Sequence, residues 1–230
     1  MQISKMESKL LESASIKSLV VFSVKDVCVL LNLKHSQVYD LIKSLKKKKL
    51  IKVLNNGHYS MNDVDDLILA PYTTRFSYVS FLSALNFYGL SDQMPQRILL
   101  ATISSTKNKK YVFVRVSKKI FFGYTTVNNI IIADREKAII DCLYLPRYSG
   151  GIKEIRQALN KDYDQKKLIE YALKIGSKAV IRRLGYLLEE SGKGVNTKLH
   201  KYIGKGYEVL DPSIIRKNNY NAKWLLDVNT

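Results

Sequence analysis

Side chains suited to binding DNA are concentrated between residues 34 and 47, where apolar positions recur at helical spacing. A glutamine can pair with adenine through both atoms of its amide, and lysines suit phosphate oxygens. If this helix enters a major groove, its first residues reach base edges and its later lysines reach the backbone. The sequence therefore predicts DNA contacts from Lys34, His35, Ser36, Gln37, Tyr39, Lys43, Lys46 and Lys47.

The lysine block over residues 46–49 has a second interpretation that needs no ligand. Cations at the C-terminal end of a helix complement its dipole, so the block can be a solvated helix end. Asp40 lies on the same expected face and opposes uniform contact with phosphates. Both interpretations stay open at the level of sequence.

The first seventy residues predict the elements that would position these side chains. Helical periodicity appears in three segments, residues 4–14, 24–31 and 37–45, with a β-like run at 19–22. Ser23 and Asp26 have the spacing of a capping box, and Ser36 is expected to cap the third helix. A four-residue turn at 32–35 makes the last two helices a helix-turn-helix candidate.

A β-hairpin is expected directly after the third helix. Residues 50–54 and 58–61 suit strands, and Asn55-Asn56-Gly57 supplies the backbone freedom of a tight turn. Such a hairpin would be the wing of a winged helix, with Asn55, Asn56 and His58 as further DNA contacts. A helix over residues 63–69, capped by Asn62, and a boundary at 70–74 would close the domain.

The rest of the chain predicts a mixed α/β domain. Helical segments are expected over residues 78–88, 134–143, 152–159, 165–175 and 178–190, and strand-like runs over 97–103, 111–117, 121–127 and 130–133. Turns are expected at 106–110 and 128–129. The predicted fold class is α+β, with a winged helix-turn-helix over residues 1–71. An antiparallel-rich sheet followed by C-terminal helices is expected over residues 75–230.

Catalytic and cofactor motifs are not evident in the sequence. The two Gly-Lys-Gly segments at 192–194 and 204–206 lack the spacing of a phosphate-binding loop, and the three histidines are far apart. Residues 134–137, Asp-Arg-Glu-Lys, resemble a nuclease cluster, but Asp134 suits a helix cap and Glu136 suits a first helical turn. We expect a protein that is not an enzyme and has no metal and no cofactor.

The expected helix over residues 178–190 offers a candidate binding face. Its apolar stripe leaves Lys178 and Arg182 together on the opposite side, with Arg183 beside them. Gly185 also falls there, which costs about 1 kcal/mol of helix stability relative to Ala. The sequence predicts an antitoxin or nucleic-acid face at Lys178, Arg182 and Arg183; close packing of Gly185 against a neighbouring element is the alternative.

Composition and charge narrow the class of protein. The 38 Lys and Arg residues exceed the 20 Asp and Glu residues, giving a net charge of +18 that favours a polyanionic partner. No apolar run reaches the length of a membrane span, and the first residues lack the layout of a signal peptide. Cys28 and Cys142 both lie in apolar stretches and are expected to be free thiols. These features predict a cytoplasmic protein without a membrane partner.

The sequence resembles the AbiEi antitoxins of type IV (AbiE, abortive infection) toxin–antitoxin systems. The resemblance lies in residues 78–90, 121–124, 132–141, 145–151, 168–189 and 207–212, and in Trp224, Asp227 and Asn229. It implies a transcriptional repressor that binds inverted repeats in its own promoter as double-stranded DNA. It also implies that the second domain counteracts a nucleotidyltransferase-fold toxin without a stable complex.

Two other functions stay open. The chain can be a stand-alone winged-helix regulator with no toxin partner, or a nuclease of a mobile element. An adjacent gene for a nucleotidyltransferase would favour an antitoxin over a stand-alone regulator. Metal-dependent DNA cleavage would indicate a nuclease. A monomer or a homodimer is compatible with each.

Overall fold

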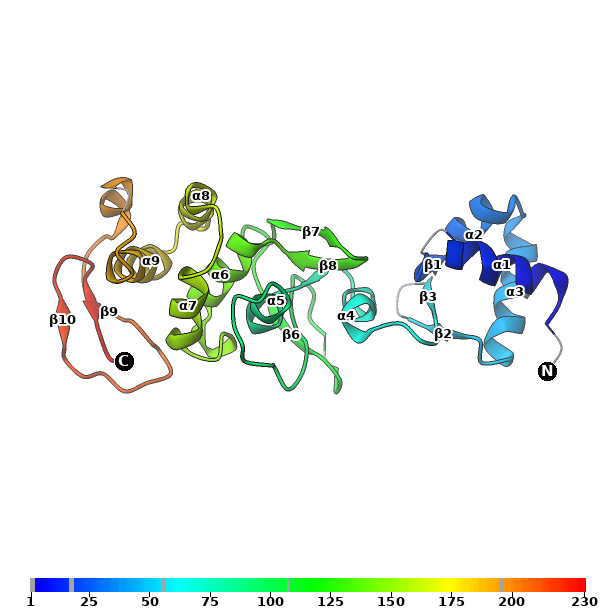
Figure 1. Ribbon diagram of the computed structural model, residues 1–230, viewed down its shortest axis with the longest axis horizontal. Helices are drawn as coiled ribbons and strands as arrows, with labels where there is room; N and C mark the ends of the chain where they lie inside the picture. Colours follow the sequence, from blue (N-terminus) through cyan, green and yellow to red (C-terminus); the bar gives the residue numbers. More distant parts are fainter. Residues whose placement is uncertain (1–2, 17–18, 55–56, 107, 195–196) are drawn as a thin grey trace. The chain divides into compact units, whose positions relative to one another are not determined.

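A computed structural model describes residues 3–16, 19–54, 57–106, 108–194 and 197–230. The fold is mixed α+β, with nine α-helices and three sheets among these residues. The chain divides into two compact units, one formed by residues 1–77 with 127–130 and the other by the remainder. Figure 1 shows the elements along the chain. None of the helices in the described part of the chain is both long and apolar enough to cross a membrane.

The first unit consists of helices around a small antiparallel sheet. Its elements are α1 (Lys5–Ile16), β1 (Val21–Ser23), α2 (Val24–Leu31), α3 (His35–Lys47), β2 (Ile51–Val53), β3 (His58–Met61), α4 (Asp66–Leu69) and the 3-10 turn η2 (Ala70–Thr73). The strand order is β1-β3-β2, and Val21 lies opposite Ser60 while Ile51 lies opposite Met61. Both predicted hairpin strands are present, although β2 covers residues 51–53 and not the predicted 50–54.

Apolar side chains from the first three helices and the sheet share one core. Leu10, Phe22, Val27, Val38 and Leu45 are each fully buried in it. The predicted stripe of α3 is confirmed, since Val38, Leu41, Ile42 and Leu45 are its buried residues. The side of α3 opposite this stripe is exposed to solvent.

The expected helix caps are partly confirmed. Ser23 and Asp26 form the predicted capping box, with the Ser23 amide donating to Asp26 Oδ2 over 2.7 Å. The expectation that Ser36 caps α3 is wrong, because α3 begins at His35 and Lys34 is its N-cap. The helix over 63–69 is also shorter than predicted: Asp65 caps α4, while the Asn62 side chain donates to the Lys49 carbonyl.

A five-stranded sheet with order β6-β5-β4-β8-β7 lies mainly in the second unit. Its strands are β4 (Ser77–Val79), β5 (Leu99–Thr102), β6 (Val112–Arg115), β7 (Tyr124–Val127) and β8 (Ile130–Ala133). β5 pairs with β6 and β4 with β8 in parallel, so the prediction of an antiparallel-rich sheet is wrong for these pairs. The segment 103–111 between β5 and β6 is shorter than the dozen or more residues usual for a parallel connection, so its length favoured an antiparallel hairpin in the sequence.

One helix is also shorter than the sequence predicts. The helix expected over 78–88 is α5 (Phe81–Phe87), because residues 77–79 form β4, and all three are buried. A short, wholly buried strand has the same apolar pattern as a buried helical turn, so periodicity alone does not separate them.

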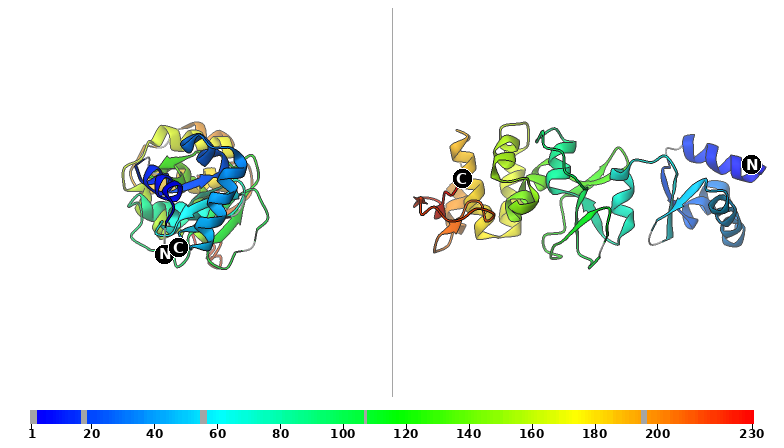
Figure 2. Two further views of the ribbon diagram at one scale, coloured as in Figure 1. Left: turned by 90° about the vertical axis from the view of Figure 1, so that its right-hand side faces the viewer. Right: turned by 90° about the horizontal axis from the view of Figure 1, so that it is seen from below.

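Helices α6 (Arg135–Tyr144), α7 (Ile152–Leu159), α8 (Gln165–Ile175) and α9 (Lys178–Glu190) complete the body of the second unit. They lie between the five-stranded sheet and the C-terminal strands in the views of Figures 1 and 2. α6 is the central helix: it contacts α5, α7, α8 and α9, and residues 136–143 are all buried.

A small C-terminal sheet follows α9. Its strands β9 (Glu208–Val209), β10 (Tyr220–Asn221) and β11 (Leu226–Asp227) have the order β10-β11-β9. β11 is antiparallel to β10 and parallel to β9. The sheet packs through Trp224, which is fully buried and stacks on His200 with ring centroids 4.2 Å apart.

Candidate nucleic-acid interface

The solvent-facing side of α3 carries a row of cationic and polar side chains. Exposed residues from its N-cap to its last turn are Lys34, His35, Ser36, Gln37, Tyr39, Asp40, Lys43, Lys46 and Lys47. Among them, Ser36, Tyr39, Lys43, Lys46 and Lys47 recur at three- and four-residue intervals, opposite the buried stripe. Lys43, Lys46 and Lys47 form no ion pair with any described residue, so their charges are available to a ligand.

The flank of α3 that faces α1 is occupied by an internal ion pair. Glu7 on α1 is almost inaccessible, and its carboxylate accepts from Lys48 Nζ over 2.6 Å and from Ser44 Oγ over 2.7 Å. Hydrogen bonds from Lys48 and from the Ser4 amide lower the pKa of Glu7 from 4.5 to about 2. Lys48 is thus the member of the lysine block that the fold uses, whereas Lys46 and Lys47 point to solvent.

Gln37 does not present its amide as the sequence predicted. Its Oε1 accepts from the Lys34 amide over 3.0 Å, which satisfies one donor at the start of α3. A bidentate contact with adenine requires that oxygen as the acceptor of the base amino group. In this conformation, therefore, Gln37 supports the helix terminus, and His35, Ser36 and Tyr39 are the other exposed polar side chains in the first turns of α3 before Asp40.

The predicted wing contacts divide into two groups. Asn55 and Asn56 lie outside the described residues. His58 is half-buried and packs on Tyr72, with ring centroids 5.4 Å apart and Nδ1 inaccessible. The expectation that His58 lies exposed at the wing tip is wrong, because its ring covers part of η2 within the same unit.

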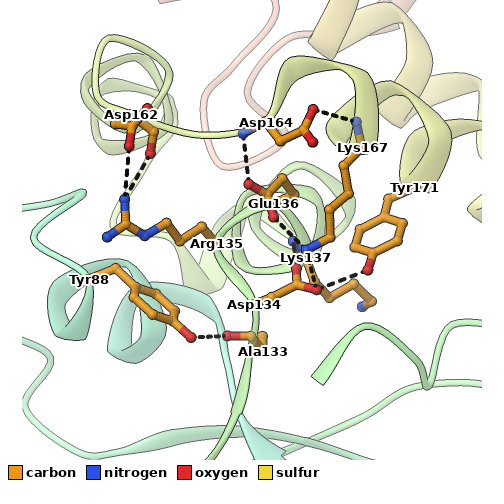
Figure 3. Close-up of polar contacts among 10 residues, drawn as sticks. All are labelled: Tyr88, Ala133, Asp134, Arg135, Glu136, Lys137, Asp162, Asp164, Lys167 and Tyr171. Carbon is orange, nitrogen blue, oxygen red and sulfur yellow. Dashed lines mark hydrogen bonds and ion pairs between the residues drawn. The ribbon is translucent and has the colours of Figure 1, made fainter. Parts of the chain in front are cut away.

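Residues 134–137 of the second unit hold two helices together. Asp134 caps α6 through a hydrogen bond from the Lys137 amide, as predicted. Lys167 on α8 lies 3.0 Å from both Asp134 and Glu136, while the Asp164 amide donates to Glu136 over 2.8 Å. Figure 3 shows these acids pointing toward α8 and Arg135 pointing toward Asp162.

The electrostatics of this network fit a structural role. Burial alone would lower the pKa of Lys167, but its hydrogen bonds to Glu136 and Asp134 raise that pKa above the ordinary value. Burial and the hydrogen bond to Asp134 raise the pKa of Tyr171 to about 12. Asp134 and Glu136 are thus paired with donors from α6, α8 or the turn before α8, which favours helix fastening over nuclease chemistry.

A buried polar cluster in the second unit is not anticipated by the sequence. Lys137 Nζ pairs with Asp141 Oδ1 and lies 3.0 Å from Tyr78 Oη, and Ser80 Oγ donates to Asp141 Oδ2 over 2.7 Å. All four residues are 0% exposed. The i to i+4 spacing of Lys137 and Asp141 was the available signal. The cluster joins β4 to α6. Because it is sealed from solvent, it offers no surface to a ligand.

The basic face predicted on α9 is wrong for two of its three members. Arg182 and Arg183 are 1% and 5% exposed. Arg182 donates to the carbonyls of Ile203 and Lys205, and Arg183 donates to those of Leu143 and Val209. Burial lowers the pKa of Arg183. The chain after α9 folds back over this side of the helix, so only Lys178 remains exposed.

Gly185 packs closely against a neighbouring element, which was the alternative to a binding face. A Cβ built at Gly185 would lie 2.1 Å from Trp224 Cζ3, well inside any allowed contact. The backbone at Gly185 therefore packs against the Trp224 ring and is not a docking surface.

The described residues hold no cluster of metal-ligand side chains, and both cysteines are free. Within the described ranges, no group of three or more His, Cys, Asp or Glu residues is placed to hold a metal ion. Cys28 and Cys142 are both free, and burial raises the pKa of the Cys142 thiol well above its ordinary value.

The comparisons with known proteins leave the function to be argued from this geometry. No protein-family model matches the sequence, and the search of curated proteins finds no match.

Proposed function

We propose that the first unit is a winged helix-turn-helix that binds double-stranded DNA, and that the chain is a transcriptional repressor. The order of three helices, then a hairpin whose second strand, β3, pairs with β1, is the order of that class. α2 and α3 are joined by a short turn in which Asn32 is left-handed (φ 53°). In the proposal, α3 is the recognition helix and the β2–β3 hairpin is the wing.

The observation that carries the proposal is the unpaired basic side of α3. Helices of this diameter enter the major groove, which is about 12 Å wide. His35, Ser36 and Tyr39 lie at the N-terminal end, from which base edges are reached. Lys43, Lys46 and Lys47 follow along the same side. In the proposal they contact phosphates on the groove wall.

The resemblance to AbiEi antitoxins extends this proposal to regulation and to a partner. It supports binding to inverted repeats in the chain's own promoter, which two copies of one DNA-binding unit match by symmetry. It also supports functional antagonism of a nucleotidyltransferase-fold toxin by the second unit, without a stable complex. A gene for such a toxin beside this one would favour the antitoxin over a stand-alone regulator.

A charge-matched pair of variants tests the role of α3. We expect the double variant Lys43→Gln and Lys47→Gln to bind duplex DNA from the chain's own upstream region more weakly than the wild type. Each lost phosphate contact reduces the slope of log K against log salt by about 0.9, so the double variant should lose about 1.8. The measurement is fluorescence anisotropy of a labelled duplex over a range of salt concentrations.

Lys153→Gln with Lys161→Gln is the control, since both lysines are exposed in the second unit and the net charge of the two proteins is equal. The control should keep the wild-type slope. Equal slopes for the α3 variant and the control would show that α3 does not contact the phosphates.

A further inference from the structure

Two exposed tyrosines meet on the C-terminal sheet of the second unit. Tyr207 precedes β9 and Tyr220 begins β10, on opposite sides of β11. Their ring centroids are 4.8 Å apart at an interplanar angle of 58°, and the residues are 40% and 51% exposed. Aromatic residues of this size normally bury their faces, so a contacting pair left in solvent offers ring faces to a ligand.

Cationic side chains flank both rings along the chain. Lys205 lies two residues before Tyr207, and Arg216 and Lys217 lie just before Tyr220. All three side chains are exposed, and none forms an ion pair or side-chain hydrogen bond with the described part of the chain. Within residues 205–220 the exposed acid is Glu208, so the exposed side chains of this segment carry a net positive charge. We call Tyr207, Tyr220, Lys205, Arg216 and Lys217 the C-terminal platform.

Buried polar side chains hold the backbone of the platform in place. Arg182 donates to the carbonyls of Ile203 and Lys205 over 2.7 and 2.9 Å. The fully buried Asp227 accepts from the amides of Asn218 and Asn219. Tyr220 Oη in turn donates to Asn218 Oδ1 over 2.8 Å, which fixes the ring over this loop.

A third buried side chain fixes the loop before Arg216. Asn229 Nδ2 donates to the Ile214 carbonyl over 2.9 Å, and Asn229 is 0% exposed. The loops that carry the exposed rings and cations are thus ordered by the fold itself. A surface ordered in advance loses little conformational entropy when it binds.

From these observations we propose that the C-terminal platform binds single-stranded nucleic acid. Unpaired bases can stack on the tyrosine rings, and the lysines and arginine bind the phosphates between them. Bases in a duplex are already stacked on one another and present only their edges, so they cannot use the ring faces. The site is separate from α3 and goes beyond the duplex binding proposed above.

Binding of a fluorescein-labelled oligonucleotide of about 12 nucleotides to the full chain tests the platform. The same mixed sequence is used as RNA, as single-stranded DNA and as duplex DNA. We expect Tyr207→Ala with Tyr220→Ala to weaken single-strand binding by at least about tenfold at unchanged salt slope, because stacking carries no net charge. Duplex binding should stay as in the wild type.

The conservative and charge variants complete the experiment. Tyr207→Phe with Tyr220→Phe keeps both ring faces and should retain single-strand binding. Lys205→Gln with Lys217→Gln should reduce the single-strand salt slope by about 1.4, while the control Lys153→Gln with Lys161→Gln should not. Trp224 fluorescence verifies that each variant is folded, since it is the single tryptophan of the chain.

Several results would overturn the proposal. One is a folded Tyr→Ala variant that binds single strands as tightly as the wild type. Another is a Tyr→Ala variant that loses as much affinity for duplex DNA as for single strands. The third is a Tyr→Phe variant that loses as much single-strand affinity as the Tyr→Ala variant. A preference between the RNA and DNA strands identifies which sugar the platform accepts. The α3 variants leave this site untouched, so failure of the platform and failure of the proposed duplex binding are distinguishable.

Discussion

At the scale of single residues, α9 shows that segments far along the chain determine what a residue contacts. Helical periodicity places Arg182 and Gly185 on a polar side, and that assignment is correct for an isolated helix. The segments 203–210 and 224–229 then cover this side, so Arg182 binds backbone carbonyls and Gly185 receives the Trp224 ring. No local signal in the sequence specifies which later segment packs there.

Replacing Gly185 tests this contact. We expect Gly185→Ala to lower the free energy of unfolding of the second unit by about 3 kcal/mol, since the added Cβ overlaps the Trp224 ring and forces it to move. The measurement is urea denaturation followed by Trp224 fluorescence. Gly194→Ala is the control, because a Cβ there has nothing within 4 Å. Equal midpoints for the two variants would contradict the packing described for Gly185.

At the scale of elements, α1 is fastened to the C-terminal half of α3 by the Glu7 carboxylate. The pKa of Glu7 is lowered in the folded state, so its contribution to stability is complete above pH 4.5 and is lost as the pH falls toward 2. This fastening fixes Lys48 on the α1 side. It thereby leaves Lys43, Lys46 and Lys47 as the cations that α3 exposes to solvent, and these are the ones we propose to contact DNA.

A titration tests the fastening. We expect the Glu7 carboxyl carbon, followed by NMR, to titrate near pH 2, and the midpoint to rise toward 4.5 in Lys48→Gln, which removes the largest cause of the shift. The first unit should also unfold more readily in urea at pH 3 than at pH 5. A Glu7 midpoint near 4.5 in the wild-type protein would exclude the Glu7–Lys48 contact in solution.

Elements set by neighbouring residues are the ones that the sequence predicts well. The Ser23–Asp26 capping box, the buried stripe of α3, the Asp134 cap of α6 and the turn at Asn128 and Asn129 each depend on residues a few positions apart. Strand direction depends on a distant partner. For this reason the parallel pairing of β5 with β6 and the inclusion of residues 77–79 in a strand were not predicted.

In the candidate site, too, features set by neighbouring residues could be predicted, and contacts with distant residues could not. The exposure of Ser36, Tyr39 and Lys43 follows from the period of one helix and could be predicted. The hydrogen bond from the Lys34 amide to Gln37 and the packing of His58 on Tyr72 could not be predicted from the sequence. The cations and tyrosines interleaved over residues 205–220 were a signal in the sequence, but their meeting across β11 depends on the C-terminal fold.

At the scale of the whole molecule, the net charge of +18 is consistent with more than one nucleic-acid surface. We propose one surface in each unit: α3 for duplex DNA, and the C-terminal platform for single strands. Non-specific attraction by so large a charge affects every affinity measured at one salt concentration. Discrimination between sequences is free of that effect, since two duplexes of equal length carry the same phosphates.

The ratio of affinities for two duplexes therefore tests the central claim most directly. One duplex is the region upstream of the chain's own gene, and the other is a shuffled sequence of the same composition. We predict that the wild type prefers the upstream duplex and that Ser36→Ala with Tyr39→Ala reduces this preference at least about tenfold. The platform variant Tyr207→Ala with Tyr220→Ala should keep the preference. A wild-type protein that binds both duplexes equally, or an α3 variant that keeps the full preference, would contradict the account.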